Sequence, residues 1–502
     1  MTEAADLVLR NGRVRTLTGD TAEAVAVRDG RIVKVGRTSE VDFLAGVETT
    51  VVDLADRVVL PGFIDAHTHM DLLGKQQVEA DLSDAESASD CLDALAARRE
   101  ETDGWILGFG YDEHRWNGTY LTRDHLDEVS TDRPVVAYRE DLHLASVNSA
   151  VLDQFDDELP GEYVETKSGT PTGVLREDAL SVLRERIDPG PERIREYLRT
   201  AQAYAHRHGV TSVHDIVRDP EVARTYRELD RDGDLTLRVR LNYTADFLDA
   251  IDETGLVTNH GTDHLRIGAI KAFADGSFGS RTARLSEPYA DGEGRGEWTT
   301  PPEELAALVD RIDEADLQAM IHAIGDDAVD AVVDAYEGTV AQRHRIEHAE
   351  LLSAGKMEDI AAEDIVVSAQ PNFLKWAREG GLYDDRLGEQ RRRQTNQFRR
   401  VLDAEIPLAF GSDCMPMDPL FGIEQVTTAP EDSQRLDTTA AVRAYTLGGA
   451  YAGFDEHRLG TIEPDKRGDL VVLDQSPWEQ SDIGSLAVEM TIVDGSVVYQ
   501  RF

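Results

Sequence analysis

The chain is poor in cysteine and in long apolar runs. Only 2 of its 502 residues are cysteines, Cys91 and Cys414, too few for the disulfide framework of a small secreted domain. No apolar run approaches the roughly 18 residues that a membrane helix needs, and the first residues lack the basic and apolar regions of a secretory signal. We therefore expect a soluble cytoplasmic protein with no membrane partner.

Basic residues, and lysine above all, are also scarce. The chain has 52 Lys and Arg against 97 Asp and Glu, a net charge of −45, and only 7 of the 52 are lysines. The acidic residues are spread along the whole chain together with 41% hydrophobic residues, which excludes a disordered acidic tail. We interpret the composition as the acidic surface of a protein from a halophile. Such a surface repels phosphates, so we expect no nucleic acid partner.

Short apolar runs of the kind that form buried parallel strands recur along the middle of the chain. Most are separated by lengths that hold a helix and a loop, which is typical of a (β/α)₈ TIM barrel in the α/β class. The eight strand candidates are Phe63–His67, Val210–His214, Leu237–Leu241, Leu265–Lys271, Leu317–His322, His344–His348, Ile365–Ser368 and Ile406–Phe410.

Both ends of the chain are rich in β-forming residues and turn signals, such as Asn11-Gly12 and Asp494-Gly495. We therefore predict one composite β-sandwich built from residues 1–61 and 460–502. The catalytic barrel would take residues 62–75 and 174–459. The interval 76–173 is too long for one helix and is predicted to be an inserted α+β segment that covers the active site, with a helix at Ala88–Glu101 and strands near Trp105–Phe109 and Pro134–Tyr138.

Residues that can bind a metal stand at or just past the ends of these strand candidates. They are His67, His69, His322, His348 and Asp413. The carboxyl ends of barrel strands meet at one face, where active sites of this architecture lie, so the pattern predicts metal-assisted hydrolysis. Singly the signals are weak: a lone buried histidine is more often satisfied in the core, and an Asp on a Ser-Asp turn is often a helix N-cap. The number of strand ends involved favours a metal site.

Lys271 ends the apolar run Ile267–Ile270 in a chain that has almost no lysine. A buried lysine is costly unless it is paired, so two roles are open. In one, Lys271 forms an ion pair with Asp275. In the other, CO₂ carbamylates it to an anionic ligand that bridges two divalent ions.

These segments resemble the amidohydrolase superfamily, and within it the amidohydrolase-3, YtcJ-like branch that includes N-substituted formamide deformylases. The resemblance covers nearly the whole chain and implies the barrel and the composite sandwich. It also implies a divalent metal, usually zinc, and hydrolysis mostly at C–N bonds. The segments that carry it are Pro61–His69, Lys271–Ser277 with Ser280–Ala283, His322–Asp326, Arg345–Ala349 and Gly411–Asp413.

The inserted segment also resembles this branch, through Asp141-Leu142-His143 and Val147–Ala150, although Leu142 stands where a glycine is common. The resemblance implies substrate contacts from the insertion and from the loop after the fourth strand. The residues named on this basis are Tyr111, Asp112, Trp116, His143, Asp275 and Arg281. Alternatively, the insertion residues pack the core of their own segment.

The leading hypothesis is a hydrolase that cleaves an amide or N-formyl C–N bond of a small molecule. Two Zn²⁺ ions bridged by carbamylated Lys271 would share a hydroxide, and Asp413 would carry the proton. A mononuclear deaminase of the same fold is one alternative, although such relatives usually place a Glu soon after the fifth-strand histidine, and His322 is followed by Ala-Ile-Gly-Asp. A non-catalytic regulatory relative is another. A homodimer is possible for each.

The composition predicts that stability rises with salt. A net charge of −45 produces self-repulsion that molar salt screens, because the Debye length falls from ~30 Å at ~0.01 M to ~3 Å at ~1 M. Melting curves in a KCl series from roughly 0.1 to 3 M should therefore show a rising melting temperature. A flat or falling series would show that the acidic surface has been misinterpreted.

Overall fold

The computed structural model describes residues 3–116, 118–139, 144–155, 158–176, 178–187, 189–340, 343–353 and 355–501. The chain divides into two compact units, Met1–Met70 with Gln202–Phe502, and Asp71–Ala201. Each unit is described by itself. The two units do not correspond one to one to the three predicted domains, so the boundaries of those domains stay predictions.

Eight parallel strands of the first unit form the predicted barrel, with the strand order β21-β20-β19-β18-β17-β16-β15-β8. Their bounds are β8 (Phe63–Thr68), β15 (Val210–Val217), β16 (Arg238–Thr244), β17 (Leu265–Phe273), β18 (Gln318–Ala323), β19 (Arg345–His348), β20 (Val366–Ala369) and β21 (Leu408–Phe410). Each strand corresponds to one of the eight apolar runs, so the predicted fold class is confirmed. The strands are almost wholly buried, as expected where helices cover a parallel sheet.

The barrel nearly closes between its last and first strands. The backbone N–H of Asp413 donates to the carbonyl of His67 at 2.8 Å. Gly411, which follows β21, lies so close to β8 that a Cβ added to it would stand 2.4 Å from the backbone nitrogen of His67. A side chain at position 411 would therefore push the two strands apart and move Asp413 away from His67.

Helix α8 (Pro220–Asp232) shows why the intervening segments are helical. Asp219 accepts a hydrogen bond from the N–H of Glu221, Pro220 occupies the first turn, and Gly233 ends the helix at φ 76°. The other helices of this unit are α1 (Thr38–Val41), α9 (Leu248–Glu253), α10 (Pro302–Glu314), α11 (Asp326–Tyr336), α12 (Met357–Ala362), α13 (Leu382–Arg392), α14 (Phe398–Asp403), α15 (Pro419–Thr427), α16 (Thr438–Arg443) and α17 (Gly449–Ala452).

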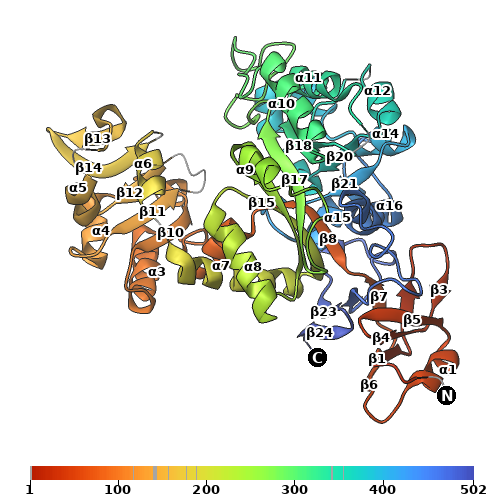
Figure 1. Ribbon diagram of the computed structural model, residues 1–502. Coiled ribbons are helices and arrows are strands. Elements are labelled where there is room, and N and C mark those ends of the chain that lie inside the picture. Colours follow the sequence, from red (N-terminus) through yellow and green to blue (C-terminus); the bar gives the residue numbers. More distant parts are fainter. Residues whose placement is uncertain are drawn as a thin grey trace. The chain divides into compact units, whose positions relative to one another are not determined.

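Strands from both chain ends form the β-sandwich, as predicted. One sheet has the order β5-β4-β1-β6 and the other β24-β23-β22-β7-β2-β3, so the second joins strands from both ends. Figure 1 shows the red N-terminal strands beside the blue β23 and β24. The two sheets share one core, which includes Leu7 and Val25 from the first and Val472 and Ile492 from the second. The strands are β1 (Leu7–Arg10), β2 (Arg13–Arg15), β3 (Thr21–Ala22), β4 (Ala24–Arg28), β5 (Arg31–Gly36), β6 (Thr50–Asp53), β7 (Val58–Pro61), β22 (Leu470–Leu473), β23 (Val488–Val493) and β24 (Ser496–Gln500).

The second unit is a mixed sheet with the order β13-β14-β12-β11-β10-β9 between two helical layers. Its helix α3 (Ala88–Glu101) lies where the sequence predicts one. The predicted strands correspond to β10 (Ile106–Tyr111) and β11 (Val135–Arg139). Its other strands are β9 (Ala80–Asp81), β12 (Leu144–Val147), β13 (Val164–Lys167) and β14 (Thr170–Arg176), and its other α-helices are α4 (Arg123–Val129), α5 (Ser149–Phe155) and α6 (Asp178–Arg186). Helices α2 (Met70–Val78) and α7 (Gly190–Arg207) cross the two ends of the unit.

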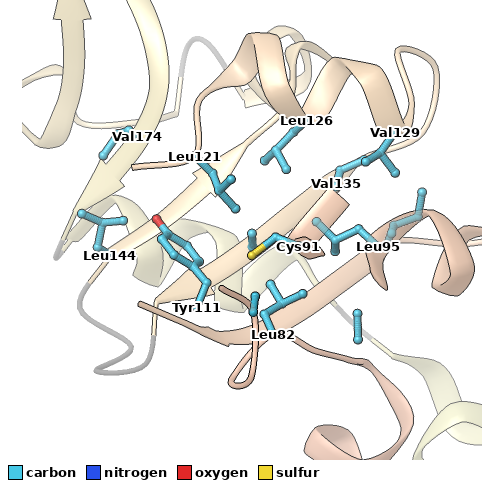
Figure 2. Packing of buried hydrophobic residues seen from close by; sticks show 14 residues of the cluster. Leu82, Cys91, Leu95, Tyr111, Leu121, Leu126, Val129, Val135, Leu144 and Val174 are labelled. Atoms are coloured by element: carbon cyan, nitrogen blue, oxygen red, sulfur yellow. The ribbon is translucent and has the colours of Figure 1, made fainter. Parts of the chain in front are cut away.

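Side chains that alternate along these strands form a core on each face of the sheet. Val135 belongs to the cluster with Leu95 of α3 and Leu126 of α4, which Figure 2 shows, and Val136 belongs to the cluster with Val151 of α5. None of the helices in the described ranges is long and apolar enough to cross a membrane.

Candidate metal site

The six predicted ligands come from five barrel strands or the loops that follow them. His67 and His69 lie at the end of β8, Lys271 in β17, His322 in β18 and His348 at the end of β19, while Asp413 follows β21. Possible ligand atoms of His67, His348 and Asp413 all lie within 4.8 Å of one another. His69 Nε2 is 3.1 Å from Asp413 Oδ1, and the rings of His322 and His348 are 4.4 Å apart. The fold therefore gathers side chains that are up to 346 positions apart.

Hydrogen bonds to acceptors orient three of the imidazoles. Nδ1 of His67 donates to the Glu347 carboxylate, and Nδ1 of His348 donates to Gln370 Oε1 at 2.6 Å. Nε2 of His322 donates to the Gly276 carbonyl at 3.0 Å. Burial holds the pKa values of these three histidines well below their usual range. Each neutral ring thus keeps one nitrogen with a lone pair for another ligand.

Lys271 is fully enclosed but unpaired. Its side chain is 1% exposed, and Nζ has no hydrogen-bond partner among the described residues, although it lies 4.8 Å from the centroid of the Phe273 ring. Burial lowers the pKa of this amine to about 8, while Glu347 and Asp413 oppose the shift. An unpaired buried amine is costly, so this nitrogen is suited to carry a further group.

Asp275 is not the partner of Lys271, so the alternative ion pair is not formed. Oδ1 of Asp275 accepts a hydrogen bond from Ile324 N at 3.0 Å, and Oδ2 accepts from Arg284 N at 2.8 Å and from Gly325 N at 2.9 Å. The buried carboxylate thereby ties the loop after β17 to the loop after β18. Its predicted contact with substrate stays a prediction.

The carboxylate of Asp413 is held in its ionised form. Burial by itself would raise the pKa of Asp413, but the hydrogen bond from His69 and the nearby Lys271 outweigh it and lower the pKa to about 2. An ionised carboxylate can bind a metal ion or accept a proton at neutral pH.

The backbone is strained where the ligands from β19 and β21 leave their strands. His348 has φ 71° and Ala349 φ 48°, and Asp413 and Cys414 have φ 51° and 60°. Each such non-glycine residue costs of order 1–3 kcal/mol, and such strain clusters at functional sites. The turn at His348 interrupts the strand alternation, so both Glu347 and His348 contact the His67 ring.

Glu347 and Arg345 are the principal residues that the sequence prediction missed. Arg345 Nε donates to Glu347 Oε1 at 2.8 Å, and its Nη2 donates to the Ala66 carbonyl at 2.6 Å. Arg345 therefore holds both the carboxylate that orients His67 and the strand that carries His67. Period-two alternation in Arg345-Ile346-Glu347 places both charges on one face of β19, a signal that could have identified them.

The other predicted substrate contacts have local partners in their own units. Arg281 is exposed and forms an ion pair with Asp291 at 2.8 Å. In the second unit Tyr111 is buried, with its hydroxyl 2.9 Å from Ser146 Oγ, and stacks on Trp116. Asp112 caps the turn that begins at Glu113. His143 lies outside the described residues. All of these contacts stay predictions, and the packing of Tyr111, visible in Figure 2, is the alternative that the sequence left open.

The donor set fits a divalent transition metal. It combines neutral imidazoles, an ionised carboxylate and a buried amine that has no hydrogen-bond partner within the described ranges. Imidazole and carboxylate ligands suit zinc and related ions, and ligands must be deprotonated to bind. A metal would also offset part of the strain and the cost of burial described above.

Comparison with known proteins agrees with this geometry. The sequence pattern of the amidohydrolase family matches residues 50–499 of this chain. The putative amidohydrolase YtcJ of Bacillus subtilis is 30% identical over 96% of this chain and 97% of its own. The N-substituted formamide deformylase of Arthrobacter pascens is 28% identical over 100% of this chain and 99% of its own. An uncharacterized metal-dependent hydrolase from Pyrococcus furiosus has a solved structure that superimposes with a TM-score of 0.83 at 29% identity, covering 94% of this chain and 100% of that one.

The contact between Glu347 and His67 predicts a role for Glu347 in metal affinity. The Glu347 carboxylate accepts from His67 with one oxygen and from Arg345 with the other. In Glu347→Gln one of these oxygens is replaced by an NH2 group, which cannot accept, so one donor loses its partner and the His67 ring loses its fixed orientation. We expect zinc affinity, measured by competition with a chromogenic chelator, to fall about 10- to 100-fold.

The matched control is Glu358→Gln, which removes the same charge from an exposed position in the first turn of α12. Thermal melting of both variants separates weaker metal binding from unfolding. Equal zinc affinity in folded Glu347→Gln and in the wild type would refute the positioning role.

Proposed function

The chain belongs to the amidohydrolase family, and on that premise we propose that it hydrolyses a C–N bond of amide or N-formyl type in a small molecule. The observation that carries the proposal is the position of six side chains that could bind a metal at the carboxyl face of the barrel, one of them the amine of Lys271, whose Nζ has no hydrogen-bond partner among the described residues. The Arthrobacter relative, named as a deformylase of N-substituted formamides, supports this bond type.

A divalent metal would be held by His67, His69, Lys271, His322, His348 and Asp413. We propose two Zn²⁺ ions, with Lys271 as a carbamate formed when its neutral amine adds to CO₂ and releases a proton. The lowered pKa of Lys271 supports this step because it increases the neutral fraction. When bound, such ions would polarise the substrate carbonyl and lower the pKa of water.

The protein residues then position and move protons. Asp413, ionised and adjacent to His69, accepts the proton of the attacking water and delivers it to the leaving nitrogen. Glu347 and Gln370 keep the His67 and His348 rings directed at the site. Water and an amide thus give a carboxylic acid and an amine, with Asp413 restored to its ionised form.

Replacement of Lys271 tests the metal site. Lys271→Ala removes the proposed bridging ligand, so we expect the metal content to fall by one equivalent and most of the hydrolytic activity to be lost, while the melting temperature shows a folded protein. Elemental analysis and a formamide hydrolysis assay, with bicarbonate in the buffer, give the two readouts. A variant that hydrolyses substrate normally, beside a wild type without divalent metal, would contradict the proposal.

Replacement of Asp413 tests proton transfer. Asp413→Asn keeps the size of the side chain but cannot accept a proton, so turnover should fall at least ~10²-fold at neutral pH. Metal content is measured in parallel, because Asp413 is also a proposed ligand. Near-normal turnover in a variant that keeps its metal would assign proton transfer to another group.

A further inference from the structure

A cavity of about 590 Å³ lies in the first unit between the loop that follows β2 and helix α16, and none of the residues that line it is a candidate metal ligand. This volume is typical of sites for small molecules. Its charged lining residues are the cations Arg15, Arg443 and Lys466 and the carboxylates Asp20 and Glu463. The cavity therefore has one more cation than carboxylate, in a chain whose net charge is −45.

Lys466 and Glu463 satisfy each other and form a fixed wall of the cavity. Nζ of Lys466 donates to the Glu456 carbonyl at 2.7 Å and to Thr461 Oγ1 at 2.6 Å, and lies 3.4 Å from Glu463 Oε2. Thr461 Oγ1 in turn donates to Glu463 Oε2 at 2.5 Å. The ammonium group is thus already supplied with acceptors, so a ligand in the cavity would be recognised by the two arginines.

Arg15 is a half-buried cation that forms no ion pair with any described residue. It lies on β2, where Val14 is buried in the sandwich core and its neighbours Arg13 and Arg15 are directed outward by the strand alternation. Arg13 pairs with Glu479 at 2.8 Å. Arg15 forms no such pair, although Asp20 lines the same cavity and the chain carries 97 acidic residues. Its guanidinium therefore stays available to an anion from outside the chain.

Arg443 supplies a second half-buried guanidinium from helix α16 (Thr438–Arg443). Its Nη1 donates to the carbonyl of Leu17, which fixes the side chain against the loop after β2, and within the described ranges it forms no ion pair. The residues that follow, Ala444–Gly448, form a π-helix, and Leu447 in it lines the cavity. Short π-helices occur frequently at functional sites, so the backbone of this wall also indicates a binding site.

An aromatic ring lies beside these cations. Trp478 is half-buried in the cavity wall, and its Nε1 donates to Thr439 Oγ1 at 2.9 Å, which fixes the plane of the ring. The guanidinium of Arg15 lies 5.1 Å from the centroid of this ring. Leu17 and Leu447 add apolar surface. A planar ligand can stack on such an aromatic or guanidinium surface while its charged group binds the arginines.

We propose that this cavity is a second ligand site, which binds a small aromatic anion whose carboxylate or phosphate group is held by Arg15 and Arg443 and whose ring lies on Trp478. The inference does not depend on the proposed hydrolase function. Half-buried guanidinium groups without a counter-ion lose hydration, and an oxyanion restores charge-assisted hydrogen bonds in the fork geometry that suits arginine. An inorganic anion alone would leave most of the cavity unfilled and would not contact the indole ring.

The test measures the binding of four probes to the metal-loaded protein by titration calorimetry, at the lowest KCl concentration that keeps the protein folded, because salt screens the interaction. Benzoate and phenyl phosphate carry both a ring and an oxyanion, phenol lacks the oxyanion, and inorganic phosphate lacks the ring. We expect at least one of the two aromatic anions to bind with a Kd below about 1 mM. Phenol and inorganic phosphate should bind at least tenfold more weakly than that anion.

Substitutions assign the binding to the cavity. Arg15→Gln and Arg443→Gln each remove one guanidinium and should each weaken the aromatic anion at least tenfold. Arg13→Gln is the matched control, since it removes an arginine charge from the same strand and the same face that is already paired with Glu479. It should change the Kd less than twofold. Melting curves show which variants are folded, and Arg15→Gln decides the question if the loss of the bond to Leu17 unfolds Arg443→Gln.

Three results would overturn the inference. One is that neither benzoate nor phenyl phosphate binds to the wild type. Another is that the aromatic anion binds as tightly to folded Arg15→Gln as to the wild type, which would place it at the metal site or elsewhere on the chain. The third is an equal loss of affinity in Arg13→Gln and Arg15→Gln, which would mean a general effect of charge.

Discussion

The hydrogen bond between the Glu347 carboxylate and His67 Nδ1 is the interaction on which the rest of the site depends. This hydrogen bond joins β19 to β8. Arg345 holds both of its sides in place, because it donates hydrogen bonds to Glu347 Oε1 and to the carbonyl of Ala66 in β8. Because Glu347 accepts a hydrogen bond from Nδ1 of His67, the other ring nitrogen, Nε2, is left facing Asp413 and lies 3.8 Å from its Oδ1. Loss of one partner from such a buried charged network typically costs about 3–5 kcal/mol, because the remaining charge is left uncompensated. The network therefore sets the geometry of the site and cannot lose a member without destabilising the barrel.

Around this network the chain keeps features that reduce its own stability. Lys271 is buried, and its Nζ has no hydrogen-bond partner in the part of the chain that the structure describes. The four residues His348, Ala349, Asp413 and Cys414 adopt left-handed backbone conformations. A fold without a ligand to bind would gain by replacing them with apolar or glycine residues. All of these features lie within a few residues of the predicted ligands, as expected where part of the stability is exchanged for a preorganised site.

The sequence predicted those parts of the structure that local patterns determine. All eight barrel strands follow from apolar runs, and Ala88–Glu101 follows from helical periodicity. Strand β14 (Thr170–Arg176) was not predicted, because Pro171 and Gly173 are signals against a strand and only its pairing with β12 and β13 stabilises it. Gln370 was also missed, since its partner His348 is 22 residues away and only the folded barrel brings them together. The three backbone donors to Asp275 could not be predicted either, because two of them lie about 50 residues further along the chain and meet its carboxylate only in the folded barrel.

The central claim, that the six side chains form one metal site, is tested most directly by anomalous diffraction from crystals of the metal-loaded protein at the zinc absorption edge. The account predicts two peaks within bonding distance of the ligand atoms of His67, His69, His322, His348 and Asp413, and added density on Lys271 Nζ that reaches both. The absence of anomalous density at this face, with Lys271 paired to a carboxylate of the protein instead, would contradict it.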